Sequence, residues 1–164
     1  MADKQHHYEV GVRWTGNTGA GTESYRSFER AHDIEAEGRP VLQGSADAAF
    51  RGDPARWNPE DLLVGALSEC HMLSYLSLAP AAGVNVVAYT DTATGTMTTH
   101  RDASGEFDEV VLHPVVTVAE AGMAEAARKL HEKAHEVCFI ARSVNFPVRH
   151  EPEIRVDGGG RAAG

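Results

Sequence analysis

The chain has 164 residues, of which 42% are hydrophobic and 24% are charged. This length and composition suit one globular domain with a hydrophobic core. The formal net charge of −9 disfavours nucleic acids and anionic membranes as partners, because both are bound through basic surfaces. No apolar stretch reaches about 18 uncharged residues, and the N-terminus, MADKQHHYEV, has no signal-peptide segment. We therefore expect a cytoplasmic protein.

The first predicted element is a strand over residues 7–15, in which apolar side chains alternate onto one face. A turn, GNTGAGT, follows it, and residues 24–35 suggest a second strand that would complete a hairpin. GNTGAG lacks the lysine of a phosphate-binding loop, and no helical pattern follows it. Residues 35–57 are rich in glycine and proline and predict a long irregular loop.

A long helix is predicted to begin after Asn58, because asparagine suits the N-cap and Pro59 suits the first helical position. Glu60 and Asp61 would complement the positive end of the helix dipole. Apolar residues follow at helical spacing, and a proline at position 80 and a glycine at position 83 predict the end. Because the helix is apolar on most sides, we expect it to be central and buried.

The second half of the sequence predicts two further strands, a helix and a last strand. Residues 84–100 and 107–118 have strand-like patterns, with the turn ASGEFD between them. A second helix is predicted over about residues 120–137, and HEPEIRV, residues 150–156, suggests a short final strand. This order of elements indicates an α+β domain with an antiparallel sheet.

The domain organisation follows from the absence of any visible break. No internal repeat and no boundary interrupts the sequence, so we predict a single domain over residues 1–157. The glycine-rich residues 158–164 are predicted to be a disordered tail.

Two cysteines, Cys70 in the first predicted helix and Cys138 after the second, are candidates for thiol chemistry. Burial alone would explain each of them, since free cysteine is among the most buried residue types. A reactive thiol would need a lowered pKa and partial access to solvent. If the two lie close together, one could be oxidised to a sulfenic acid and the other could condense with it. Their spacing in the sequence leaves both interpretations open.

The string HEKAH, residues 131–135, matches the pattern H-E-x-x-H. In a zinc hydrolase His131 and His135 would bind the metal, and Glu132 would be the general base. Alternatively, both histidines simply flank the apolar stripe of a partly exposed helix. Because the pattern fixes only three positions and the chain has no obvious second lobe, zinc chemistry is the weaker hypothesis.

Two motifs together carry a resemblance to a known family. NPEDLL, residues 58–63, is followed by Cys70 ten residues after Glu60, and a second cysteine ends the string AHEVC. In these motifs, and in the order of its elements over about residues 8–156, the chain resembles the OsmC/Ohr family of organic hydroperoxide reductases. The resemblance implies an α+β, OsmC-like fold with antiparallel sheets around two central helices. It also implies an intertwined homodimer with active sites at the subunit interface.

The resemblance further implies a thiol-dependent peroxidase that reduces organic hydroperoxides to alcohols. By it, Cys70 is the peroxidatic thiolate and Cys138 the resolving thiol that forms a disulfide with it. An external thiol reductant, a dithiol or a lipoylated protein, would regenerate the pair, and no cofactor or metal is implied. The alternative on the same fold is a binding or redox-sensing module without peroxidase turnover.

By the same resemblance, an arginine would stabilise the thiolate and Glu60 would hold that arginine. Arg51, nine residues before Glu60, fits best, and the alternatives are Arg56, Arg39 and Arg26. Ten helical residues span about 15 Å, too far for Glu60 to serve Cys70 of its own chain through one arginine. A second subunit would therefore supply the carboxylate, with two such helices antiparallel across a twofold axis.

Glu69, directly before Cys70, departs from the family, in which a small residue is common there. A carboxylate beside a thiol would raise the pKa of the thiol. Neighbours on a helix point about 100° apart, however, so the Glu69 side chain could face elsewhere.

Overall fold

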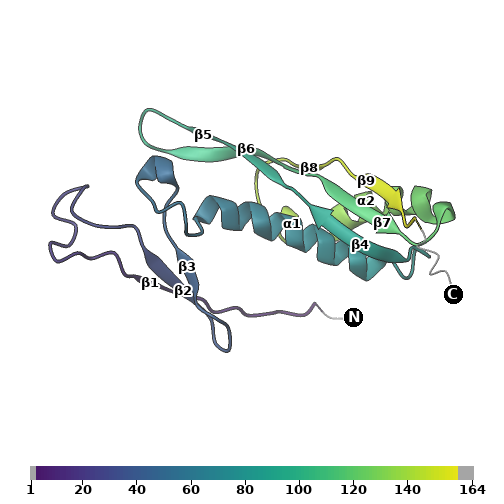
Figure 1. The fold of residues 1–164 in the computed structure, drawn as a ribbon, viewed down its shortest axis with the longest axis horizontal. Coiled ribbons are helices and arrows are strands. Elements are labelled where there is room, and N and C mark those ends of the chain that lie inside the picture. The colour runs from purple at the N-terminus through teal and green to yellow at the C-terminus, as the bar shows by residue number, and fades with distance from the viewer. Residues whose placement is uncertain (1–2, 159–164) are drawn as a thin grey trace. The chain divides into compact units, whose positions relative to one another are not determined.

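The computed structural model describes residues 3–158 and comprises two compact units, which meet in the sequence between Leu63 and Val64 (Figure 1). The single domain expected from the sequence stays a prediction. Apart from Gly158, the predicted tail over residues 158–164 lies outside the described residues. Within the described part of the chain, none of the helices combines the length and apolar character that crossing a membrane requires.

The first unit contains a three-stranded antiparallel sheet in the order β1-β2-β3. Its strands are β1 (Gly11–Trp14), β2 (His32–Glu35) and β3 (Leu42–Gly44), and the short 3-10 helix η1 (Ala48–Phe50) follows. The predicted hairpin of the first two strands is present. Strand β3 was missed within the predicted loop because its three residues are too few to show an alternating pattern.

The second predicted strand begins later than its sequence suggested, because the preceding residues fold as a hydrogen-bonded loop. Asn17 Oδ1 accepts hydrogen bonds from the backbone N–H groups of Gly19 and Gly21, at 2.9 and 3.0 Å. Both glycines have positive φ, a conformation that suits glycine far better than other residues. The alternating pairing with β1 therefore starts only at His32.

Helix α1 (Pro59–Leu78) has the predicted bounds, because its start is set by local chemistry. Asn58 Oδ1 accepts a hydrogen bond from the Asp61 backbone N–H at 2.7 Å, and Asn58 Nδ2 donates to Asp61 Oδ2 at 2.8 Å. The first bond satisfies one backbone N–H group that the first helical turn leaves free, and the second holds the Asn58 side chain in place. The expected complete burial is not observed within the second unit, where Leu73 on α1 is 60% exposed.

The second unit holds two three-stranded sheets, in the orders β4-β7-β9 and β5-β6-β8. Its strands are β4 (Val86–Asp91), β5 (Thr94–Thr99), β6 (Gly105–Leu112), β7 (Pro114–Val118), β8 (Val148–His150) and β9 (Glu153–Val156). Each of the two long predicted strands is thus divided into two. At the break, Asp91 accepts hydrogen bonds from the His113 N–H at 2.7 Å and from the Ser68 hydroxyl of α1 at 2.6 Å. Asp91 therefore ties the bend in the sheet to the helix.

The predicted antiparallel pairing is present in the first four strand pairs. The last two strands differ, since β8 pairs with β6 and β9 pairs with β7 in parallel. Parallel neighbours require a crossover connection. Helix α2 (Ala124–Val137), preceded by the 3-10 turn η2 (Ala121–Met123), lies within that connection, and the 3-10 turn η3 (Ala141–Ser143) follows. The chain consequently returns to the sheet in the same direction as β6 and β7.

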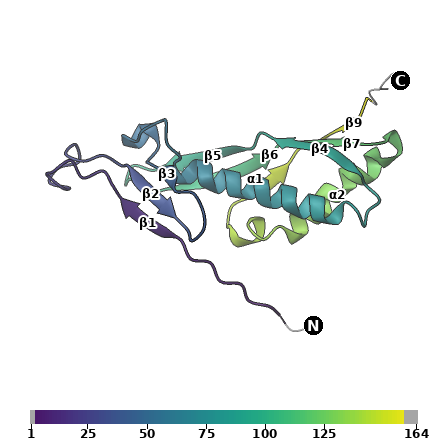
Figure 2. The ribbon, with the colours of Figure 1, turned by 60° about the horizontal axis from the view of Figure 1, so that its bottom comes forward.

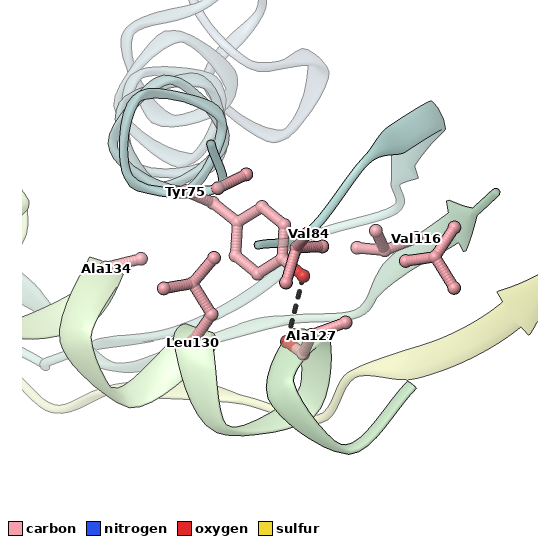
Figure 3. Close-up of a cluster of buried hydrophobic side chains, with 8 residues drawn as sticks. Tyr75, Val84, Val116, Ala127, Leu130 and Ala134 are labelled. Atoms are coloured by element: carbon pink, nitrogen blue, oxygen red, sulfur yellow. Dashed lines mark hydrogen bonds between the residues drawn. The ribbon is translucent and has the colours of Figure 1, made fainter. Parts of the chain in front are cut away.

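Helix α2 and the part of α1 that belongs to the second unit lie on the same side of its two sheets, as Figure 2 shows. The main core cluster combines Tyr75 of α1, Val116 of β7 and Ala127 of α2. The Tyr75 ring points from α1 toward α2, and its hydroxyl donates to the Ala127 carbonyl at 2.8 Å (Figure 3). Burial raises the pKa of Tyr75 to about 12. This bond satisfies a polar group that would otherwise be costly to bury.

Candidate active site

The two cysteines sit at different depths in the second unit. Cys70 lies on α1 and is partly buried, whereas Cys138 follows the last residue of α2 and is only 1% exposed. Both are free thiols. Cys138 leaves the helical conformation, while its N–H still bonds the His135 carbonyl at 3.3 Å. The end of α2 therefore fixes where the buried sulfur lies.

The antiparallel packing of α1 and α2 makes the two thiols neighbours. Along α1, His71 contacts His131 and Tyr75 contacts Ala127, so residue numbers rise on one helix as they fall on the other. Cys70 accordingly lies close enough to Cys138 to influence its ionisation. The pKa of Cys138 is raised to about 11, mainly by burial and further by the neighbouring Cys70, against backbone hydrogen bonds that lower it.

An apolar cavity of about 410 Å³ opens beside Cys70. Its volume falls in the range typical of small-molecule sites. Cys70 lines this cavity directly, whereas Cys138 does not. The apolar residues that line it are Ala66, Leu73, Leu78, Val137, Phe139 and Ile140. An uncharged organic molecule could therefore reach the partly buried sulfur through an apolar surface.

Three polar side chains other than Cys70 also line this cavity: Glu69, Ser74 and Ser77. Glu69 is exposed to solvent. The sequence left open whether its side chain faces away from the cysteine. In the structure Glu69 and Cys70 share the cavity, although they are adjacent on the helix.

Glu60 and Arg51, the other two predicted site residues, belong to the first unit. Glu60 lines a separate cavity of about 270 Å³, and its Oε2 atom is buried without a hydrogen-bond partner. Arg51 is exposed and has a positive φ of 66° at the end of η1. In the described part of the chain, no ion pair joins Arg51 to Glu60.

Arg30, which no pattern in the sequence indicated as a site residue, lines the same cavity as Glu60. Its guanidinium group lies over the rings of Tyr25 and Phe28, at 4.4 and 4.2 Å. It also donates hydrogen bonds to the backbone carbonyls of these two residues. No motif marks Arg30, because its relation to Glu60 arises only when the segment that leads into β2 and the start of α1 come together.

A group of histidines occupies the contact between α1, α2 and β8. His71 Nε2 and His131 Nδ1 are 3.0 Å apart, and the His150 ring lies within 6.0 Å of both rings. His150 in turn contacts Glu132 at 3.2 Å. Two members of the string HEKAH thus have partners within the fold. Among residues 3–158, no three His, Cys, Asp or Glu side chains are grouped to hold a metal ion.

Comparison with known proteins identifies the family. The family model described as OsmC-like protein matches residues 52–153. An OsmC-like protein of unknown function from Vibrio cholerae is 31% identical, with 90% of this chain and 99% of that chain covered and a TM-score of 0.80. No curated protein sequence matches the chain.

Two more distant structures share the fold. An OsmC-like protein from Mycoplasma pneumoniae is 12% identical, with coverage of 93% and 99% and a TM-score of 0.70. An organic hydroperoxide resistance protein, OsmC, from Legionella pneumophila is 17% identical, with coverage of 94% and 100% and a TM-score of 0.68. The predicted family resemblance and the α+β, OsmC-like fold are confirmed. The chain belongs to the OsmC-like protein family.

Proposed function

We propose that the protein is a thiol peroxidase that reduces organic hydroperoxides to alcohols through Cys70 and Cys138. The main support is the position of Cys70, which is partly buried and lines an apolar cavity, next to the buried thiol of Cys138. Partial access suits the attacking sulfur, and shielding suits the sulfur that reacts only with its neighbour. The Legionella pneumophila relative, named for organic hydroperoxide resistance, adds support for a peroxide-related role.

In the first step, the Cys70 thiolate attacks the distal oxygen of the hydroperoxide. The O–O bond breaks, an S–O bond forms, and the alkoxide takes up a proton and leaves as the alcohol. The sulfur is thereby oxidised by two electrons to a sulfenic acid. The Cys138 sulfur then attacks Cys70, and the hydroxyl group leaves as water with the Cys138 proton. An external dithiol reduces the resulting disulfide and is itself oxidised.

The contrast between the two thiols supports this assignment of roles. Burial holds the pKa of Cys138 at about 11, so this thiol is almost entirely protonated at neutral pH. A protonated thiol is a poor nucleophile toward peroxide. Cys138 is therefore suited to wait until an electrophilic sulfenic acid forms beside it.

We infer that an arginine paired with Glu60 assists ionisation of Cys70, and that a second subunit supplies this pair. Arg30 is the preferred arginine, because it lines the same cavity as Glu60, although no ion pair joins the two within the described residues. Arg51 is the alternative, followed by the other arginines considered from the sequence, Arg56, Arg39 and Arg26. Helical spacing of about 15 Å between positions 60 and 70 keeps Glu60 from its own Cys70. A second copy of the chain would bring the carboxylate to the thiol.

Exposed apolar side chains in both units support the homodimer. Val12 and Trp14 of β1 are 69% and 44% exposed, and Leu73 and Leu76 of α1 are 60% and 37% exposed. Rows of apolar side chains on one strand face and one helix face are typical of surfaces that a partner covers.

The test counts free thiols before and after addition of cumene hydroperoxide to the reduced protein. We expect the wild type to lose both thiols and to recover them with dithiothreitol. Cys70→Ser should lose none, and Cys138→Ser should be oxidised once without efficient recycling. Full peroxidase activity in Cys70→Ser would refute the mechanism. Thiols that do not react in the wild type would favour a binding module instead.

A further inference from the structure

The side chains that one copy of the chain contributes to the cavity beside Cys70 bring charge of one sign only, and the arginine inferred above would come from a second subunit. Among its described lining residues, Glu69 is the only carboxylate and none is a lysine, arginine or histidine, and the others are apolar residues, serines and Cys70 itself. No ion pair to Glu69 is present in the described part of the chain. The formal net charge of −9 acts in the same direction.

We propose that Glu69 is a specificity-determining residue, which makes the cavity select uncharged hydroperoxides over anionic ones. This inference rests on the proposed peroxidase function and adds the charge class of its substrate. The apolar lining binds the organic part of the substrate through burial of its surface. The carboxylate repels a second negative charge that enters beside the reacting sulfur.

Geometry makes this repulsion local. Ala66 and Leu73 lie three residues before and four residues after Glu69, so they flank it on the same helix face. An anionic substrate bound to this apolar row would bring its charge within several ångströms of the carboxylate. Two like charges about 7 Å apart near a protein surface disfavour binding by a factor of about three to ten at an ionic strength of about 0.1 M.

Alkylation of Cys70 measures this effect without any peroxidase turnover. Iodoacetamide is neutral and iodoacetate is anionic, and in both reactions the thiolate sulfur displaces iodide. Because both reagents consume the thiolate, their rate ratio cancels any effect of Glu69 on the pKa of the thiol. Modification of Cys70 is followed by mass spectrometry, and the buried Cys138 serves as an internal reference.

In Glu69→Gln we expect the iodoacetate rate, relative to the iodoacetamide rate, to rise about three- to tenfold at an ionic strength of about 0.1 M. The matched control is Glu120→Gln, which removes an exposed carboxylate that does not line the cavity and should leave the ratio unchanged. Added salt should shrink the difference between wild type and Glu69→Gln. An unchanged ratio in Glu69→Gln would overturn the inference.

A second measurement compares kcat/KM for cumene hydroperoxide with a para-carboxylate and for the methyl ester of the same compound. The wild type should favour the ester, and Glu69→Gln should reduce that preference by a similar factor. If the wild type reduces both compounds equally well, the specificity inference fails and the peroxidase proposal stands. If it reduces neither, the peroxidase proposal fails, and the alkylation ratio still decides whether Glu69 excludes anions from the cavity.

Discussion

His71 Nε2 and His131 Nδ1 lie 3.0 Å apart, in rings that are parallel within 5° and buried between α1 and α2. Their exposed fractions are 1% and 0%. The remaining ring nitrogens, His71 Nδ1 and His131 Nε2, are buried without a hydrogen-bond partner. A neutral pair can share one proton in this bond, but a charged pair would place like charges together in an apolar interior.

We predict that this pair makes the protein acid-sensitive. The pKa of His71 is lowered to about 4, by burial first and then by His150 and His135. The pKa of His131 is lowered to about 3, by burial, His71, His150 and Arg128. The unfolded chain binds protons at both histidines near their ordinary pKa of about 6.5. The contribution of the neutral pair to the free energy of unfolding is therefore fully present above about pH 6.5, and it is lost as the pH drops from about 6.5 toward 4.

The quantity to measure is the slope of the free energy of unfolding against pH. Each histidine that is protonated only in the unfolded state lowers the free energy of unfolding by about 1.4 kcal/mol per pH unit. Glu132 contacts His150, which lies beside the pair, so its carboxylate offsets part of the positive charge when these histidines are protonated. Urea denaturation between pH 7.5 and pH 5 checks the prediction. His7→Gln, which changes an exposed histidine, is the control and should leave the slope unchanged.

Single and double replacements of the pair should not be additive. His71→Leu or His131→Leu alone leaves the other imidazole buried without its partner, which costs about 1–3 kcal/mol. The double variant removes both polar groups, so we expect it to be more stable than the sum of the single effects predicts, by about 0.5–3 kcal/mol. Chemical denaturation of the four proteins gives this coupling energy. Strict additivity would show that the two rings do not interact.

Arg30 and Arg51 should differ in their effect on the thiol. If Arg30 is the guanidinium that supports Cys70, Arg30→Met should slow alkylation by iodoacetamide at pH 7 about tenfold and move its pH dependence to higher pH. Arg51→Met should change little. Because Arg30 also holds a loop through Tyr25 and Phe28, unfolding should be measured alongside. The opposite ranking of the two variants would assign the role to Arg51.

The proposed homodimer predicts a specific weakness at Leu73. A charge buried in an interface without a partner is strongly unfavourable, so Leu73→Asp should shift the protein toward monomers in sedimentation velocity experiments. The control is Val87→Asp, at a residue of β4 that is 49% exposed. A wild-type protein that remains monomeric at high concentration would contradict the dimer.

The sequence predicted those features whose causes are local. The bounds of α1 followed from Asn58 and Pro59, because a helix cap acts through neighbouring residues. Strand β3 and the breaks in the long strands were not predicted, since they depend on pairing and on the distant Asp91 contacts. The parallel pairing of β8 with β6 and of β9 with β7 was not predicted either, because it also depends on contacts between distant segments.

The candidate site divides in a similar way. Cys70 and Cys138 were marked by residue type and motif, but only the packing of α1 against α2 makes them neighbours. The bond between His71 and His131 had no sequence signal, because one residue follows a cysteine and the other begins a string that resembled a metal motif. Arg30 stands outside every motif, and only the folded first unit relates it to Glu60.

Strands β8 and β9 come late in the sequence but pair with the earlier strands β6 and β7, and this has a consequence during synthesis. Val148 pairs with Val110, and Ile154 pairs with Val116, so neither sheet of the second unit gains its third strand until β8 and β9 have left the ribosome. Until then the nascent chain presents β6 and β7 with an unpaired edge, which is prone to associate with other chains. Ribosome-stalled fragments that end before residue 148 should therefore recruit chaperones, and fragments extended past residue 156 should not.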